Sequence, residues 1–216
     1  MKSNALILML ALSLAVPGVS YASEETQLFA ETTSLAEQGN ASAQGNLGAM
    51  YDEGRGVPQD YVEAMKWYRK AAELGDATAQ AVLGTMYEKG RGVTRDFAEA
   101  VKWYRKAADQ RDAMAQNNLG LMYARGRGVP KDEAEAVKWY REAADQGLAS
   151  AQNNLGLMYA RGRGVTKDEA EAYKWYLLSG SKGNESAREN IFLLERKLTP
   201  SQRAEGQRLA REFVPK

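Results

Sequence analysis

Paired acidic side chains at a fixed interval are the residues of this sequence most able to do chemistry. An Asp precedes a Glu by three positions in four places: Asp60 and Glu63, Asp96 and Glu99, Asp132 and Glu135, Asp168 and Glu171. Two neighbouring carboxylates could serve as a general acid and base, or could hold a cation. The same spacing resembles a capping box, in which both carboxylates bond to free backbone N–H groups at a helix start. Capping explains the whole pattern, so we favour it over a catalytic dyad or a cation site.

Two missing residue types limit the other chemistries that the chain could perform. The sequence contains no His and no Cys. It therefore lacks a thiolate nucleophile, an imidazole base or metal ligand, a Cys-ligated zinc and an iron–sulfur cluster. We predict no catalytic residues, no cofactor-binding residues and no metal ligands.

Four glycine-rich loops resemble phosphate-binding loops at first sight. Each reads Gly-Arg-Gly-Val, and they occupy residues 54–57, 90–93, 126–129 and 162–165. No Lys-Ser or Lys-Thr pair follows the second glycine, and no β-strand is expected before the first. We therefore interpret each loop as a left-handed glycine cap at a helix end, followed by a tight connector.

The acids and the loops belong to a unit of 36 residues that occurs four times. In the first copy, Ala43, Leu47, Met50 and Tyr51 fall at i, i+4, i+7 and i+8. The same offsets recur after the loop, at Ala64, Tyr68, Ala71 and Ala72. Each unit is therefore predicted to form two amphipathic helices, one before the loop and one after it.

Glycines and aromatic pairs recur inside these helices. A glycine within the first helix costs about 1 kcal/mol relative to alanine, so we expect a neighbouring helix to pack its Trp or Tyr there. These glycines are Gly48, Gly84, Gly120 and Gly156. The Trp-Tyr pairs at 67–68, 103–104, 139–140 and 175–176 could stack bases or sugars. Their place on the apolar stripe favours a role in the core.

Residues 1–22 have the pattern of a secretory signal peptide. Lys2 forms a basic start, an apolar run extends from Ala5 to Val16, and Ser20-Tyr21-Ala22 fits a cleavage site. An uncleaved anchor helix is less favoured, because Pro17 and Gly18 interrupt the run before it reaches the length of a membrane span. No Cys follows to carry a lipid, and no later segment is apolar enough to enter a membrane. We expect a periplasmic or secreted protein that does not insert into the membrane after cleavage.

Net charge argues against nucleic-acid binding. Removal of Lys2 leaves 28 basic and 28 acidic residues. A chain without net charge has no field to attract nucleic acid or anionic lipid non-specifically. We therefore expect no nucleic-acid partner.

The repeated unit closely resembles the Sel1-like repeat family, a relative of the tetratricopeptide repeats. The shared pattern is AxAQxxLGxMYxxGxGVxxDxxEAxxWYRKAA, and it covers residues 43–183. Arg111 departs from it, because Gly75, Gly147 and Gly183 end the other three copies. The resemblance implies an all-α fold, a right-handed α-α superhelical solenoid of antiparallel helix pairs. A cysteine-rich branch of the family is associated with β-lactam chemistry, which is not carried over to a chain without Cys.

The ends of the array are expected to be capped, since an end unit lacks one neighbour. Residues 23–42 align with half a repeat, ending in a second helix. At the other end, residues 184–216 are expected to form degenerate capping helices. Thr199, Pro200 and Gln202 there provide a cap residue, a first-turn proline and a matching polar residue, while Leu209, Ala210 and Phe213 mark the packing face of the final helix.

A partner is expected to bind where the copies differ. The resemblance implies a concave face lined by the first helices, and copies three and four share a signature there. This candidate site comprises Asn117, Asn118, Leu121, Asn153, Asn154 and Leu157. The Asn amides could hold an extended peptide, or the leucines could simply fill contacts between neighbouring repeats; both interpretations stay open. The connector arginines Arg55, Arg91, Arg127 and Arg163 could recognise an acidic partner, but we favour a solvated edge of ion pairs.

The function implied by the resemblance is a non-enzymatic scaffold or adaptor of the bacterial envelope that binds another protein. One alternative is a periplasmic immunity protein that neutralises a delivered toxin such as a lipase. A hydrolase acting on the cell wall through carboxylates is less favoured, because the recurring acids are explained by helix capping.

Overall fold

The computed structural model describes residues 21–215, which form eleven α-helices and no strand. Residues 1–20, which contain most of the predicted signal peptide, lie outside the described part. The helices are α1 Tyr21–Glu37, α2 Ala41–Glu53, α3 Tyr61–Glu73, α4 Ala77–Lys89, α5 Phe97–Asp109, α6 Ala113–Arg125, α7 Glu133–Asp145, α8 Ala149–Arg161, α9 Glu169–Ser181, α10 Glu185–Glu195 and α11 Pro200–Glu212.

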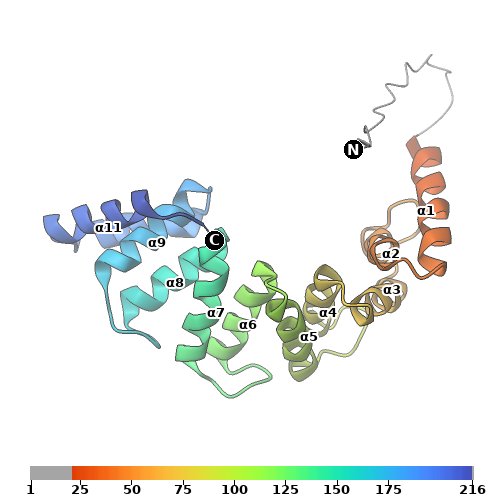
Figure 1. Cartoon of the computed structure of the whole chain (residues 1–216), viewed down its shortest axis with the longest axis horizontal. Coiled ribbons are helices and arrows are strands. Elements are labelled where there is room, and N and C mark those ends of the chain that lie inside the picture. The colour runs from red at the N-terminus through yellow and green to blue at the C-terminus, as the bar shows by residue number, and fades with distance from the viewer. Residues whose placement is uncertain (1–20, 216) are drawn as a thin grey trace, which may run out of the picture.

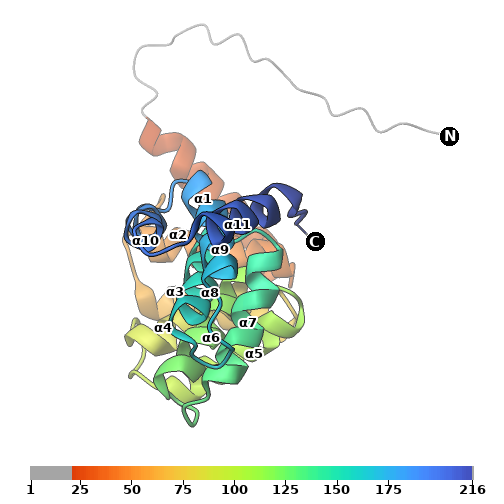
Figure 2. The same ribbon diagram turned by 90° about the vertical axis from the view of Figure 1, so that its left-hand side faces the viewer.

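The helices from α1 to α10 stack in chain order into an arch, and α11 packs back onto α9 (Figure 1). Each of α2, α4, α6 and α8 packs against the next helix of its own repeat, and that helix packs against the following repeat. The two ends of the stack, α1 and α11, lie on the same side of the arch (Figure 2). The predicted all-helical solenoid is confirmed. No helix among residues 21–215 has the length and hydropathy needed to cross a bilayer.

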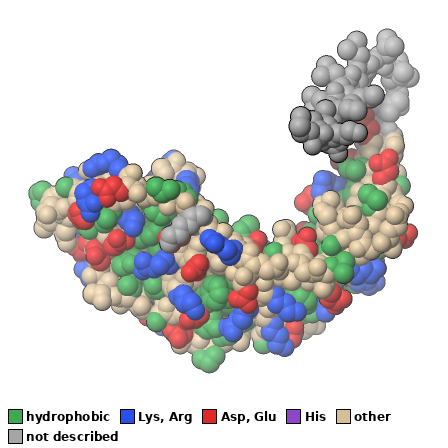
Figure 3. Space-filling model, in the orientation of Figure 1, with side chains coloured by type: hydrophobic (Ala, Val, Ile, Leu, Met, Phe, Trp, Pro, Cys, Tyr) green, Lys and Arg blue, Asp and Glu red, His purple; other side chains and the backbone are tan. Residues whose placement is uncertain are grey.

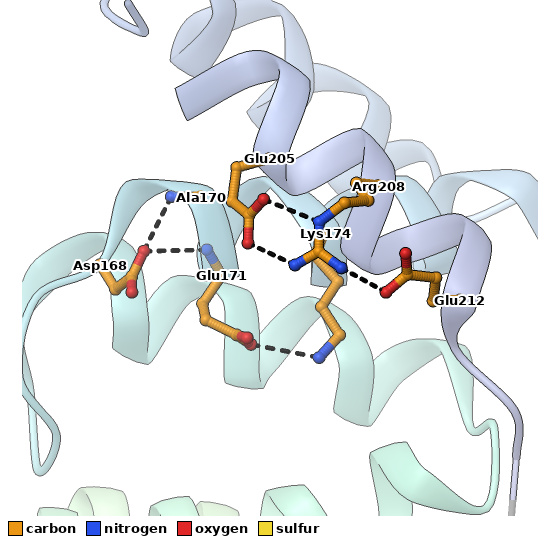
Figure 4. Close-up of polar contacts among 7 residues, drawn as sticks. All are labelled: Asp168, Ala170, Glu171, Lys174, Glu205, Arg208 and Glu212. Atoms are coloured by element: carbon orange, nitrogen blue, oxygen red, sulfur yellow. Dashed lines mark hydrogen bonds and ion pairs between the residues drawn. The ribbon is translucent and has the colours of Figure 1, made fainter. Parts of the chain in front are cut away.

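The recurring acids are helix caps, but only the Asp of each pair caps. Asp168 Oδ1 accepts from the backbone N–H groups of Ala170 and Glu171 at 2.9 and 3.0 Å (Figure 4). The equivalent caps are Asp60, Asp96 and Asp132. The predicted reciprocal bond from the Glu is wrong, because the Glu side chains instead pair with a Lys three residues later, as Glu171 does with Lys174 at 3.3 Å. A reciprocal capping box does occur at Thr199 and Gln202, as predicted.

The two glycines of each connector have different tasks. Gly126 ends α6 in the left-handed conformation, with φ of 64°, as predicted for the first glycine. The second glycine, Gly128, has φ of 69° and lies against the start of α5 in the preceding repeat, where an added Cβ would be 2.2 Å from the carbonyl oxygen of Phe97. Gly56, Gly92 and Gly164 approach another helix equally closely. For Gly92 and Gly164 it is the second helix of the preceding repeat, and for Gly56 it is α1. The connectors therefore join neighbouring repeats as well as the two helices of one repeat.

Arg111 is the one non-glycine residue with positive φ, 66°, among residues 21–215. Its side chain is exposed. A left-handed conformation costs an L-residue about 1–2 kcal/mol. Glycine removes this strain, but part of the gain is lost because glycine also raises the conformational entropy of the unfolded chain. We expect Arg111→Gly to stabilise the chain by about 0.5–1 kcal/mol, measured as a higher midpoint in urea. Arg111→Ala is the control, because it removes the same long side chain and keeps the Cβ; equal effects of the two substitutions would contradict the strain argument.

Tyrosine fills the gap left by each glycine of a first helix. A Cβ on Gly84 would lie 2.5 Å from the ring of Tyr104, and the same pairing joins Gly48 to Tyr68, Gly120 to Tyr140 and Gly156 to Tyr176. All four tyrosines are buried. The expected aromatic contact is thus made by the tyrosine and not by the tryptophan.

The tryptophans belong to the core only in part. Trp103 and Trp175 are buried, whereas Trp67 and Trp139 are half-buried. A Lys ammonium lies over each indole ring, at distances from 3.7 to 5.3 Å from the ring centroid. The outer side of each Trp is therefore covered by a cation, and the rings do not form a bare stacking surface.

A buried glutamine connects each first helix to the preceding repeat. Gln116 Nε2 donates to the carbonyl oxygen of Ala108, eight residues earlier, at 3.2 Å. The same bond recurs at Gln44, Gln80 and Gln152. This role accounts for the recurrence of the glutamine in all four copies.

The two ends of the array are closed by different contacts. Gly56 packs on the Glu25 carbonyl of α1, so α1 occupies the place that a second helix has in the repeats. At the other end α11 packs along α9 and has little contact with α10. Phe213 contacts the Trp175 ring edge-on at 5.4 Å, and Gly206 lies against the Ala170 carbonyl. Thus α11 covers the start of α9, where the connector of a further repeat would otherwise pack.

Candidate partner-binding face

The first-helix face is the surface formed by α2, α4, α6, α8 and α10. These helices follow one another along the arch, and α4 and α6 touch directly. Two side-chain bonds join later members of the row: Asn154 Nδ2 donates to Asn117 Oδ1 at 2.9 Å, and Asn190 Nδ2 donates to Asn153 Oδ1 at 3.1 Å. Three of the four asparagines in the candidate site therefore contribute to contacts between repeats.

The six residues of the candidate site differ in exposure. Asn117 is buried, while Asn118, Asn153 and Asn154 are half-buried. Leu121 is half-buried against the core of the C-terminal repeats, and Leu157 lines an open hollow. Asn118 and Leu157 are the members that line a hollow of this face.

One hollow of about 350 Å³ lies between α2, α4 and α6. We call it the N-terminal hollow. Its apolar lining includes Val82 and Met114, and Met114 is 65% exposed. The other three copies carry Ser or Thr in place of this methionine: Ser42, Thr78 and Ser150. Asn118 of the candidate site lines the same hollow.

A second hollow, of about 240 Å³, lies between α8 and α10. We call it the C-terminal hollow. Leu157, Leu193 and Tyr176 form much of its apolar lining. Its charged lining residues are the bases Arg161, Lys167 and Lys197 and the acid Glu169. Sequence reasoning missed Leu193 and Lys197, although Leu193 stands 36 residues after Leu157 and so continues the leucine row of copies three and four into α10.

Burial raises the pKa of a tyrosine hydroxyl in each hollow. Burial raises the pKa of Tyr176 in the C-terminal hollow to about 12. The pKa of Tyr68 in the N-terminal hollow is also raised, chiefly by burial and then by Asp52. A hydrogen bond from Lys167 lowers the pKa of Glu169 below its ordinary value. At neutral pH the hydroxyls therefore act as neutral hydrogen-bonding groups, and Glu169 is a carboxylate.

The recurring acids do not converge on a catalytic or metal centre in the described part of the chain. Residues 21–215 contain no group of three Asp or Glu side chains placed to hold a metal ion. Each capping Asp lies at its own helix start, bonded to backbone N–H groups. The four capping Asp side chains are therefore separated along the array and do not form one site.

The stacked helix pairs define a solenoid of the tetratricopeptide type. The family model described as Sel1 repeat matches four consecutive segments, residues 41–76, 77–112, 113–148 and 149–184. The chain therefore belongs to the Sel1 repeat family.

Several solved structures are similar to the chain. The protective antigen c5321 of uropathogenic Escherichia coli, described as having an SLR fold, is 39% identical with a TM-score of 0.81; the match covers 86% of this chain and 40% of that one. A Sel1 repeat protein from Oxalobacter formigenes is 35% identical with a TM-score of 0.75, covering 86% and 76%. The immunity protein Pa5087 from Pseudomonas aeruginosa is 26% identical with a TM-score of 0.52, covering 87% and 71%. No protein of curated function matches the chain.

Proposed function

We propose that this chain is a non-enzymatic scaffold or adaptor that binds another protein through its first-helix face. One observation carries the proposal: many residues that recur in every copy are used in architecture, whereas side chains that differ between copies, such as Met114 and Leu157, are found in the lining of the two hollows of that face. The recurring Asp, Gly and Gln side chains cap helices, admit close contacts and join repeats. Specificity then rests on variable positions such as Met114, Leu121 and Leu157.

We propose a place for this scaffold in the bacterial envelope, either in the periplasm or outside the cell. The support is the sequence of residues 1–22, with its basic start, apolar run and small residues at the cleavage site. A partner would then be met outside the cytoplasm.

A pull-down comparison tests the face. We expect the wild type to capture a partner from envelope extract, and the double variant Leu121→Glu plus Leu157→Glu to lose it, because two charges would stand where apolar contacts are needed. Val62→Glu plus Leu74→Glu is the matched control, since these apolar residues are 52% and 59% exposed and belong to α3 and its C-terminal cap. Circular dichroism checks that both variants fold. Equal capture by the wild type and the Leu121/Leu157 variant would reject the site.

A second candidate function is that of an immunity protein that neutralises a delivered toxin such as a lipase. It is favoured by the similarity to Pa5087, whose description names it an immunity protein. A neighbouring gene for a delivered effector, together with tight binding of that effector by this chain, would support this function over a general scaffold. A hydrolase acting on cell-wall material is the least favoured, since each recurring Asp caps a helix and each recurring Glu pairs with a Lys, as Asp168 and Glu171 do.

A further inference from the structure

The charge at the C-terminal ends of the first helices changes sign along the stack. The two residues at this position are Asp52-Glu53 in α2, Glu88-Lys89 in α4, Ala124-Arg125 in α6, Ala160-Arg161 in α8, and Arg196-Lys197 at the end of α10. The row therefore begins with two acids and ends with two bases. The nearly neutral total charge conceals this difference between the two halves of the first-helix face.

The acids of the first half are paired with connector arginines. Arg55 pairs with Glu53 at 2.6 Å within the same repeat. Arg91 lies 3.6 Å from Asp52, and Arg127 lies 3.9 Å from Glu88, so each of these arginines reaches back to the preceding repeat. The acidic end is thus largely neutralised by the protein itself.

The bases of the second half have no such partners. Arg91 and Arg127 each find a carboxylate in the preceding repeat. The residue at that position for Arg163 is Ala124, which has no carboxylate. Among residues 21–215, no ion pair is formed by the exposed side chains of Arg125, Arg161, Arg163 or Lys197. The nearby Lys167 and Glu169 pair with each other at 2.8 Å. Arg161 and Lys197 line the C-terminal hollow together with this pair, so its lining carries a net positive charge.

An apolar row adjoins this positive charge. Leu121, Leu157 and Leu193 occupy equivalent positions of α6, α8 and α10, where the first two copies have Ala49 and Thr85. Leu193 is 55% exposed and, with Leu157, lines the C-terminal hollow. Glu189 is an exposed acid of α10 one turn before Leu193. Figure 3 shows that hydrophobic and charged side chains are interspersed over one face of the arch.

We infer that the C-terminal hollow binds an extended acidic segment of a partner protein that also carries large apolar side chains. An apolar side chain enters between Leu157 and Leu193, and flanking carboxylates pair with Arg161 and Lys197. The inference rests on the proposed protein-binding function and specifies the chemistry of the partner. The apolar lining favours a polypeptide over a phosphate ion or a sugar, because neither of these would cover the leucines.

Labelled peptides test this directly by fluorescence anisotropy with the purified protein. The probe is a peptide of alternating Glu and Leu, compared with peptides in which Gln replaces Glu, Ser replaces Leu, or Lys replaces Glu. We expect the Glu-Leu peptide to bind best, and to bind more weakly as salt is raised. Equal binding of the Gln-Leu peptide, or preference for the Lys-Leu peptide, would overturn the inference.

Charge reversal in the protein provides the second arm. Arg161→Glu plus Lys197→Glu should weaken binding of the Glu-Leu peptide about tenfold or more. Lys66→Glu plus Lys102→Glu makes the same change in net charge on α3 and α5 and should leave binding unchanged. Both Lys side chains are exposed, so the control variant should fold. Arg161→Gln plus Lys197→Gln, which introduces no new charge, should show an intermediate loss.

Three further outcomes separate this inference from the proposed function. If the Leu121/Leu157 variant loses an envelope partner that the Arg161/Lys197 variant retains, the protein-binding function stands and the acidic partner is rejected. Binding of phosphatidylglycerol vesicles through Arg161 and Lys197 without peptide binding would assign the site to a lipid surface and overturn the inference. Self-association that depends on the same residues, again without peptide binding, would assign it to a second copy and overturn it too.

Discussion

Replacing Tyr104 by alanine is expected to lower the free energy of unfolding by about 4 kcal/mol, at the high end for a core substitution. Tyr104 is 0% exposed, and its ring lies against the backbone of α4 at Gly84. Its hydroxyl donates to Glu88 at 2.8 Å and lies 3.1 Å from the Thr85 hydroxyl. Alanine would leave a cavity between the two helices of the second repeat and would remove one hydrogen bond from each of Glu88 and Thr85.

Tyr104→Phe is the matched control, because it keeps the ring in place and removes only the hydroxyl. Loss of these hydrogen bonds should cost about 1 kcal/mol. Urea unfolding followed by circular dichroism measures both variants. If the phenylalanine variant lost as much stability as the alanine variant, the packing of the ring on Gly84 would not be what holds the helix pair together.

Gly128→Ala is expected to destabilise the chain by about 3 kcal/mol, although it adds a single methyl group. The methyl carbon would lie 2.2 Å from the Phe97 carbonyl oxygen and 2.9 Å from the Ala98 nitrogen, both of them backbone atoms that cannot rotate away. The positive φ of 69° adds strain for any L-residue. The contact joins the second and third repeats, so its loss weakens the middle of the array.

Gly75→Ala separates these two causes. Gly75 also has a positive φ, 94°, but an added Cβ would meet no atom within 4 Å. This control should cost only the backbone strain, about 1 kcal/mol. Thermal and urea midpoints give the comparison. A Gly128 variant no less stable than the Gly75 variant would show that the connector does not pack tightly on the preceding repeat.

Local spacing predicted much of the repeat in advance. The apolar offsets in Ala43, Leu47, Met50 and Tyr51 depend on the 3.6-residue turn of one helix, so they could be interpreted without knowing any neighbour. The Asp caps and the first connector glycine are equally local, since their bonds join residues two to five apart. The same applies to the reciprocal cap of Thr199 and Gln202.

Contacts between distant residues explain what spacing could not predict. One miss was local: Glu171 does not cap, because its carboxylate accepts hydrogen bonds from Lys174 and from the Trp175 indole on its own helix. The burial of Asn117 follows from a bond to Asn154, 37 residues away. The role of Gln116 needs the end of the preceding helix to be in place. None of these partners is marked by a sequence motif.

The sequence by itself determined the helices, their period of 36 residues, the all-α solenoid and the family, because each depends on short-range spacing repeated many times. Only the tertiary structure decided which residues remain available to a partner. Asparagines form hydrogen bonds between repeats, and α11 covers the start of α9. The acids of α2 and α4 pair with arginines of the following connectors. The physical reason is that a side chain's availability depends on its neighbours in adjacent repeats, and stacking brings those neighbours together. The leucines and unpaired bases around the C-terminal hollow are what that stacking leaves exposed.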